Sequence, residues 1–301
     1  LSQLAPPTVA LVNNAQREHQ EFMGTVEAVA LENGSVLQSL PSHGVAIFPA
    51  DDTYTPVWQA QSGTRKQHTF ALGHPDAQAD VQASAVVWQS GAWQFMLHTP
   101  SGSAAVRLRI AGRHNVKNAL AASACALAAG VPLAVVVRGL EAFEPVKGRS
   151  RALLVKTAAG GITLVDDTYN ANPDSVRAAI DVLTELPSPR LLVLGDMGEV
   201  GNQGPQFHAE VGAYAAECGI EAVYTLGDLC QHAGRAFGAA HHFQDMDSLL
   251  AAVRQNAARF QSMVVKGSRF MKMERVVEAV LAMDLAKGQA YNHQQGEAHA
   301  A

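Results

Sequence analysis

The sequence predicts an α/β protein of two domains, with a mainly parallel sheet in the second domain. Two observations point to this fold class. From Ile162 onward, short apolar runs alternate with stretches of helical period, which is the pattern of right-handed βαβ units. The chain has 301 residues, 48% of them hydrophobic, so it is long enough to bury two separate cores.

The first part of the chain combines an α/β pattern with antiparallel strands. Residues 8–60 predict an opening strand, a helix near Glu21–Glu32 and a second strand at Val45–Phe48. From about His68 to Ile110, short alternating runs are divided by turn residues, which predicts an antiparallel meander. The runs are Val81–Ala85, Trp93–Leu97 and Val106–Ile110.

An alanine-rich helix is predicted from about Asn115. The stretch Ala119–Val137 carries no charge, but the sequence Gly130-Val131-Pro132 interrupts it. We therefore expect two packed helices there and no membrane span.

We place the domain boundary near Pro145–Arg151, where the pattern changes again. Beyond it, strands are predicted near residues 162–166, 191–195, 222–226, 240–243 and 262–266, each followed by a helical stretch. The polar tail after Lys287 is expected to be disordered.

Composition excludes several classes of function. The net charge is −5 with 16% charged residues, so the chain has no broad basic field for nucleic acid. The three cysteines lie far apart, which fits a reducing cytoplasm and argues against a disulfide framework or a cysteine metal site.

The loop from Asp166 to Ser175 is the most informative segment. It follows the apolar run Ile162–Val165 and ends in a helix start, with Asn172 as N-cap and Pro173 at the first helical position. Two acids and two amides between a strand and a helix N-terminus suit the binding of a charged ligand.

Other predicted strand ends also place charged and polar side chains at the same edge of the sheet. They are Gly195–Glu199, Gly227-Asp228 and Lys266-Gly267-Ser268-Arg269. The last suits a carboxylate or a phosphate, although a solvated helix start is the alternative. Glycines at 195, 198 and 201 do not have the G-x-G-x-x-G spacing, so a nicotinamide dehydrogenase is excluded.

Three further groups have open interpretations. Asn115 and Asn118 share one helix face, where their amides could read a base edge or cap the helix. His19, beside Glu18 and Glu21, is either a hard-metal ligand or structural. His208 faces either the crevice or solvent. We assign no function to the histidines at positions 241, 242, 293 and 299, and the chain contains no G-x-x-x-x-G-K-[ST] phosphate loop.

Five segments together resemble the UDP-N-acetylmuramoyl-tripeptide–D-alanyl-D-alanine ligases, the MurF group of the Mur ligase family. The resemblance runs from the first residues to about Ala286, with the motifs in the family's order. The segments are Asn13–Glu27, Gly112–Ala119, Asp166–Pro173, Gly195–Glu199 and Lys266–Arg269.

The resemblance implies a domain organisation. Residues 1–147 match part of a central ATP-binding domain without its P-loop, residues 148–287 match a C-terminal Rossmann-like ligase domain, and residues 288–301 form the tail. The abrupt start at Leu1, without methionine, agrees with a fragment of a longer protein.

The resemblance also implies a reaction. ATP, with Mg²⁺, activates the carboxylate of UDP-N-acetylmuramoyl-tripeptide as an acyl phosphate, and D-alanyl-D-alanine attacks it. The expected enzyme is a cytoplasmic monomer of cell-wall precursor synthesis.

Residue roles follow from the matched motifs. His19 matches a metal ligand. Asn115 and Asn118 match the helix that approaches adenine. Arg149 and Asp167 match the pair that holds phosphate and ribose. The cleft for dipeptide and acyl phosphate is expected to contain Asn170, Asn172, Lys266, Ser268 and Arg269. The catalytic residues are expected to be Lys266, Asp167 and Arg149.

Two departures from the family pattern bear on activity. Asn33 stands where related ligases carry a lysine that can be carbamylated, which leaves the number of metal ions open. Without a P-loop, the 301-residue chain alone is expected to be inactive. A non-catalytic module that binds nucleotide or a partner is the competing hypothesis.

Overall fold

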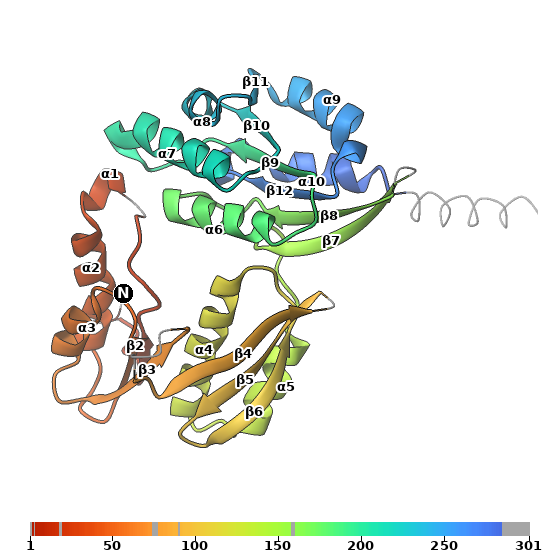
Figure 1. Ribbon diagram of the computed structural model, residues 1–301. Helices are drawn as coiled ribbons and strands as arrows, with labels where there is room; N and C mark the ends of the chain where they lie inside the picture. The colour runs from red at the N-terminus through yellow and green to blue at the C-terminus, as the bar shows by residue number, and fades with distance from the viewer. Residues whose placement is uncertain are drawn as a thin grey trace, which may run out of the picture. The chain divides into compact units, whose positions relative to one another are not determined.

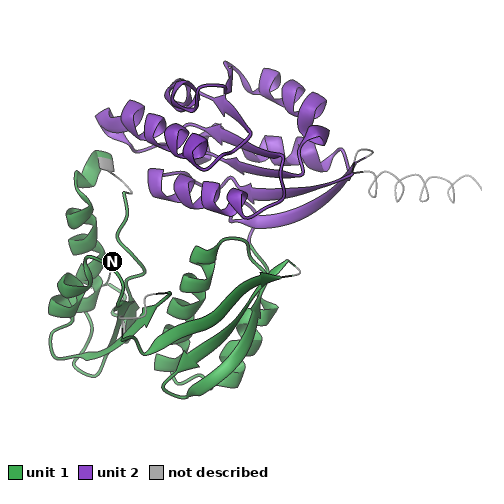
Figure 2. Cartoon of the chain, viewed as in Figure 1, with its two compact units in different colours: residues 1–145 green, residues 146–301 purple. Residues whose placement is uncertain are grey.

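The chain forms two compact units, residues 1–145 (unit 1) and 146–301 (unit 2), in the computed structural model (Figure 2). The structure describes residues 2, 4–17, 20–73, 78–89, 91–157 and 160–284. Each unit has its own sheet and its own buried core, as the α/β prediction requires.

Unit 1 is built on a six-stranded sheet in which the strands follow chain order (Figure 1). The first four strands pair in parallel, and the last three form the predicted antiparallel meander. The strands are β1 (Val9–Leu11), β2 (Val45–Pro49), β3 (Lys66–Ala71), β4 (Val81–Gln89), β5 (Ala92–Thr99) and β6 (Gly102–Leu108).

The predicted helix at residues 21–32 is wrong in its bounds. Two helices, α1 (Gln20–Met23) and α2 (Val26–Gln38), occupy this region. Gly24 separates them with a φ of 72°, which a helix does not tolerate. Thr25 then caps α2 by accepting a hydrogen bond from the Ala28 amide at 3.1 Å.

The remaining helices of unit 1 are α3 (Thr55–Ser62), α4 (Arg113–Ala128) and α5 (Leu133–Ala142). The prediction of two helices around Gly130 is confirmed, because Gly130 has a φ of 83° and Pro132 is the N-cap of α5. No helix of the described segments has the length and apolar composition needed to cross a membrane.

Unit 2 has a second six-stranded sheet, in the order β11-β10-β9-β12-β8-β7. All five predicted strands are present and pair in parallel. Strand β7 was not predicted, and it adds an antiparallel edge beside β8. The strands are β7 (Arg151–Thr157), β8 (Gly160–Asp167), β9 (Arg190–Gly195), β10 (Ala222–Leu226), β11 (His241–Phe243) and β12 (Ser262–Lys266).

Helices cover both faces of this sheet. In β9, Leu191 and Val193 belong to the core beneath α9 and α10, while Leu192 and Leu194 are buried on the opposite face. That second face is covered by α6, α7 and α8 (Figure 1). The helices are α6 (Pro173–Thr184), α7 (Gly204–Glu217), α8 (Cys230–Phe237), α9 (Met246–Asn256) and α10 (Glu274–Leu281), with 3₁₀ turns η1 (Gly201–Gln203), η2 (Ala257–Arg259) and η3 (Arg269–Met271).

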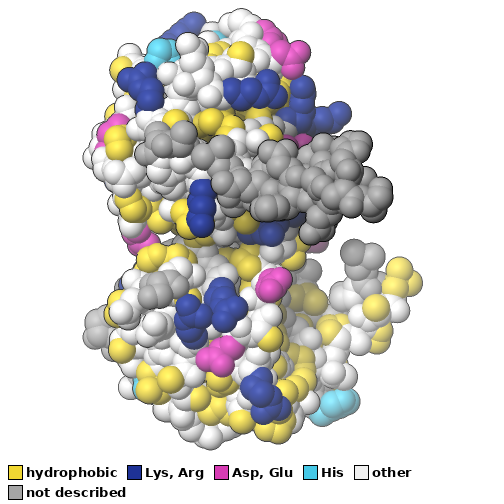
Figure 3. Space-filling model, turned by 90° about the vertical axis from the view of Figure 1, so that its right-hand side faces the viewer, with side chains coloured by type: hydrophobic (Ala, Val, Ile, Leu, Met, Phe, Trp, Pro, Cys, Tyr) yellow, Lys and Arg dark blue, Asp and Glu magenta, His cyan; other side chains and the backbone are white. Residues whose placement is uncertain are grey.

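Lys and Arg side chains lie in small separate groups on the face drawn in Figure 3. Such scattered groups agree with the prediction, made from the net charge of −5, that the chain has no broad basic field. The carboxyl ends of the parallel strands of unit 2, by contrast, gather polar groups from several loops at one edge.

Candidate functional site

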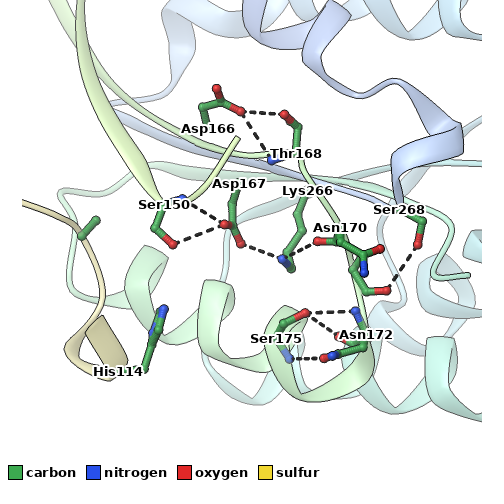
Figure 4. Close-up of polar contacts among 12 residues, drawn as sticks. His114, Ser150, Asp166, Asp167, Thr168, Asn170, Asn172, Ser175, Lys266 and Ser268 are labelled. Atoms are coloured by element: carbon green, nitrogen blue, oxygen red, sulfur yellow. Dashed lines mark hydrogen bonds and ion pairs between the residues drawn. The ribbon is translucent and has the colours of Figure 1, made fainter. Parts of the chain in front are cut away.

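Lys266 and Asp167 form a buried ion pair at the carboxyl edge of the unit 2 sheet (Figure 4). They end the neighbouring parallel strands β12 and β8 and are partners in the strand register. The Lys266 Nζ lies 2.7 Å from Asp167 Oδ2, and it also donates to the Asn170 carbonyl at 2.9 Å. The Lys266 side chain is 4% exposed and that of Asp167 17%.

The second oxygen of Asp167 connects this edge to the start of unit 2. Asp167 Oδ1 accepts hydrogen bonds from the Ser150 amide at 2.9 Å and from the Ser150 hydroxyl at 3.2 Å. Ser150 has a φ of 48°, which is uncommon for a residue with a side chain and favours a functional interpretation. The sequence prediction did not include Ser150, although it directly follows Arg149.

Asp166, the other acid of the loop, has a structural position. It is 1% exposed and accepts from the Gly148 amide at 2.9 Å and the Thr168 hydroxyl at 2.7 Å. Consecutive strand residues point to opposite faces, which is why Asp166 and Asp167 have different partners.

Arg149 is exposed and stacks on an aromatic ring. Its guanidinium lies 4.1 Å from the centroid of Tyr169. The backbone supports this contact, because the Tyr169 amide donates to the Gly148 carbonyl at 3.0 Å. A planar cation held on a ring can present its fork of N–H donors to a phosphate or carboxylate.

The loop after β8, which carries Asn170 and Asn172 and is called the amide-rich loop below, ends at the predicted start of helix α6. Asn172 caps α6 by accepting from the Ser175 amide at 2.7 Å, and the Ser175 hydroxyl accepts from the Asn172 amide at 3.0 Å (Figure 4). Pro173 occupies the first helical turn, so this part of the prediction is confirmed. The side chain of Asn170 is exposed at the same edge.

Ser268 links three loops. It is 3% exposed, and its hydroxyl accepts from the Gly198 amide at 2.6 Å and donates to the Ala171 carbonyl at 3.3 Å. Its own amide donates to the Asp196 carbonyl at 3.0 Å. Arg269, the next residue, is exposed and lies 3.3 Å from Glu274. The loops after β8, β9 and β12 are therefore tied together, as their sequence positions predicted.

His208 faces neither the crevice nor solvent, which corrects the sequence interpretation. It is fully buried on α7, beside Asp196 and Cys230. The ring nitrogen Nε2 accepts from the Met197 amide at 2.9 Å. The sequence could not show this, because burial of a single histidine depends on how α7 packs on the sheet.

In unit 1, the amides of Asn115 and Asn118 belong to one hydrogen-bonded chain. Asn13 donates to Asn118 at 2.9 Å, Asn118 donates to Asn115 at 3.0 Å, and Asn115 donates to the Ala111 carbonyl at 2.7 Å. This chain of hydrogen bonds joins the loop after β1 to the first two turns of α4. Both predicted base-reading amides are thus fixed in orientation, which a recognition role needs.

The predicted metal ligand His19 lies outside the described residues. Asn33 donates its side-chain amide to the Asn14 carbonyl at 3.3 Å, so it serves the fold beside β1. Among the described residues, one group of three potential metal ligands occurs, Asp196 with His208 and Cys230. Its mixed nitrogen, sulfur and oxygen donors do not suit Mg²⁺, which prefers oxygen.

Comparison with known proteins identifies the class. The middle-domain model of the Mur ligases matches residues 1–126, and the Mur ligase glutamate ligase domain model matches residues 150–269. The chain therefore belongs to the Mur ligase family.

Within that family the chain is similar to MurF enzymes. The UDP-N-acetylmuramoyl-tripeptide–D-alanyl-D-alanine ligase of Escherichia coli is 38% identical over 279 residues, covering 92% of this chain and 61% of the relative. A crystal structure of MurF from Acinetobacter baumannii has a TM-score of 0.84 at 32% identity and covers 93% of this chain and 61% of that one.

A third comparison concerns the fold alone. The MurF ligase of Thermotoga maritima, solved in complex with ADP, has a TM-score of 0.81 at 20% identity and covers 95% of this chain and 64% of that one. The chain thus spans about three fifths of the length of these relatives.

Proposed function

We propose that this chain belongs to an ATP-dependent ligase that joins D-alanyl-D-alanine to UDP-N-acetylmuramoyl-tripeptide in peptidoglycan precursor synthesis. A relative with 38% identity carries that name. The observation that carries the proposal is the carboxyl edge of unit 2, where the buried Lys266–Asp167 pair holds an amide-rich loop in place. Open α/β sheets bind their ligands at this edge.

The proposed reaction has two steps. A carboxylate oxygen of the tripeptide attacks the γ-phosphorus of ATP, which releases ADP and leaves an acyl phosphate. The amine nitrogen of D-alanyl-D-alanine then attacks the acyl carbon, a tetrahedral intermediate loses a proton, and inorganic phosphate leaves. The protein contributes positioning and charge neutralisation, since every reactant is anionic or becomes so.

The residues of each unit suit parts of this task. In unit 1, the fixed amides of Asn115 and Asn118 offer donors and acceptors to the edge of a purine. In unit 2, the exposed guanidinium of Arg149 suits phosphate, and Asp167 suits a ribose hydroxyl.

The loops of unit 2 are assigned to the dipeptide and the acyl phosphate. The exposed Asn170 and Arg269, together with Asn172, would contact these groups directly. The burial of Lys266 and Ser268 favours a role in which they hold the loops.

Magnesium is proposed as the partner of ATP, as in nucleotide-dependent phosphoryl transfer generally. The described residues do not assemble an oxygen-rich set of donors for it. At the carboxyl edge of unit 2, the carboxylates of Asp166 and Asp167 are engaged with Ser150, Lys266 and backbone amides. We therefore propose no metal ligand in this chain other than His19, which the resemblance to MurF implies, and we assign no reaction step to a bound metal.

We further propose that the 301 residues alone do not turn over ATP, because their sequence contains no P-loop to hold the phosphates. This same feature favours the second candidate, a module that binds nucleotide or a partner without catalysis. The proposed enzyme works in the cytoplasm as a monomer.

The test uses two proteins. One is the 301-residue chain, and the other is a chimera that adds the parts of the Escherichia coli relative outside the matched region. Phosphate release that requires ATP, the UDP-linked tripeptide and D-alanyl-D-alanine is expected from the chimera only. A folded chimera without ligation product by mass spectrometry would refute the ligase proposal, and turnover by the 301-residue chain would refute its predicted inactivity.

Arg149→Ala in the chimera gives the sharpest residue-level test. The side chain is exposed and its contact with Tyr169 is worth only about 0.5–1 kcal/mol, so folding should survive. We expect turnover to fall by at least about tenfold, as for the loss of a charge-assisted contact in the transition state. Turnover within twofold of the unsubstituted chimera would remove Arg149 from the site.

A further inference from the structure

His208 is a buried histidine whose protonation state is fixed by its neighbours. The Met197 amide donates to Nε2 at 2.9 Å, and Nδ1 lies 2.7 Å from the Gly204 carbonyl. An amide N–H can only donate and a carbonyl can only accept. The ring must therefore be neutral, with its proton on Nδ1 and a lone pair on Nε2.

From this lone pair, hydrogen bonds and one step along the backbone lead to the amide-rich loop. Met197 is followed by Gly198, whose amide donates to the Ser268 hydroxyl at 2.6 Å. That hydroxyl donates in turn to the carbonyl of Ala171, which lies between Asn170 and Asn172. The path runs from α7 through the loops after β9 and β12 to the loop after β8.

A metal site is the other use for this group of side chains, and the contacts argue against it. The ligand atoms of Asp196, His208 and Cys230 lie within 4.8 Å of one another, but those of Asp196 and His208 are engaged with backbone groups. The Asp196 carboxylate accepts from the amides of Cys230 at 2.7 Å and Leu229 at 3.3 Å. Burial raises the pKa of the Cys230 thiol, which keeps it protonated and a poor metal ligand.

We propose that His208 is a positioning residue which, as a neutral hydrogen-bond acceptor, fixes the loop after β9 and, through Ser268, the amide-rich loop after β8. The effect on catalysis rests on the proposed function, while the effect on loop structure does not. His208 touches no part of the proposed substrates, because it is fully buried behind the loop that it holds.

Protonation would reverse the contact. An imidazolium places an N–H against the Met197 amide, and neither group can then accept. Burial lowers the pKa of His208, the Gly204 carbonyl and the Asp196 carboxylate act in the opposite direction, and His232 on α8 lowers it further. Because the folded-state pKa lies below the value of about 6.5 for a free histidine, the contribution to stability is complete above that pH and is lost as the pH falls below it.

Two substitutions separate the acceptor from the rest of the side chain. In His208→Gln, the side-chain carbonyl can occupy the position of Nε2 and accept from Met197. In His208→Asn, the shorter side chain can reach only the position of Nδ1, so the Met197 amide is left buried without a partner. Both variants remove the titration, and both leave a polar group in the same cavity.

The first measurement uses the 301-residue chain labelled with ¹⁵N. We expect the His208 Nε2 shift of an unprotonated nitrogen at pH 7, slow exchange of the Met197 amide, and Asn170 and Asn172 amide shifts that are kept in His208→Gln and displaced in His208→Asn. A protonated Nε2 at pH 7, or equal shifts of both asparagines in the two variants, would overturn the proposal.

The second measurement uses the chimera. The KM for D-alanyl-D-alanine should be about tenfold higher in His208→Asn than in His208→Gln, because the lost hydrogen bond displaces the loop. Equal KM values in two folded variants would count against the positioning role. If the unsubstituted chimera makes no product, the proposed function fails, and the NMR result alone decides the role of His208.

Discussion

Removal of one partner from the Lys266–Asp167 ion pair should destabilise unit 2 strongly. The two charged atoms lie 2.7 Å apart, and the side chains are 4% and 17% exposed. Removal of one partner from a buried pair costs about 3–5 kcal/mol, because the other charge stays buried. Asp167 keeps its two contacts with Ser150 and some solvent, so we expect about 3 kcal/mol for Lys266→Met.

A double-mutant cycle measures the pair itself. Lys266→Met, Asp167→Asn and the double variant are compared with the unsubstituted chain. The double variant buries no unpaired charge, so its loss should be smaller than the sum of the single losses by about 2 kcal/mol, within the range of measured interaction energies. For a unit of this size, a loss of 3 kcal/mol lowers the melting temperature by about 6–12 °C.

The choice of probe follows from the sequence. All three tryptophans, Trp58, Trp88 and Trp93, lie in unit 1, so their fluorescence does not report on unit 2. Hydrogen exchange of the β8 and β12 amides under native conditions gives the free energy of opening at the site itself. Single losses below about 1 kcal/mol, or additive effects within about 0.5 kcal/mol, would refute the reasoning.

Three further predictions concern stability. The side chain of Arg190 holds the pKa of Glu221 at about 2, so the stabilisation from this pair is complete above the unfolded pKa of about 4.3 and is lost as the pH falls toward 2. In Glu221→Gln, the urea midpoint should therefore fall less between pH 6 and pH 3 than in the unsubstituted chain. An unchanged pH profile would contradict this. Asn172→Ala should cost about 1 kcal/mol in urea unfolding through loss of the α6 cap, whereas a neutral result would show that the cap is dispensable. Gly212→Ala should destabilise unit 2, since its Cβ would lie 2.1 Å from a backbone oxygen of α8. Gly139→Ala has open space around its Cβ and should stabilise unit 1 by up to about 1 kcal/mol. Equal shifts of the melting temperature in the two variants would show that helix propensity alone decides the effect.

The sequence predicted the elements whose pattern is set by local periodicity. The five parallel strands of unit 2 are continuous apolar runs, so their positions were found correctly. Strand β7 was missed because it is a single, largely exposed antiparallel edge strand that directly follows the predicted domain boundary. Helix α3 was missed because it has eight residues and no side-chain cap. A single glycine, Gly24, is too weak a signal to predict the break between α1 and α2 from the sequence.

The site could be predicted as a set of residues but not as a set of roles. Parallel topology alone requires that the ends of β8, β9 and β12 lie together, and Asp167, Lys266 and Ser268 do. It does not tell which polar groups are buried. That division depends on Ser150, which directly precedes β7, and on His208, which lies on α7. Their contacts join residues 17 and 11 positions apart.

Burial divides the polar residues of this edge into two kinds with different expected phenotypes. Lys266, Ser268 and His208 have their hydrogen-bonding atoms turned toward other loops, so their substitution should first reduce stability or displace a loop. Arg149 and Asn170 are exposed, so their substitution should change turnover while the urea midpoint stays within about 0.5 kcal/mol. A site organised in this way keeps its shape without ligand, since the charges that hold it are neutralised inside the protein. Preorganisation of this kind lowers the cost of binding anionic substrates, because the loops need not be ordered at that moment.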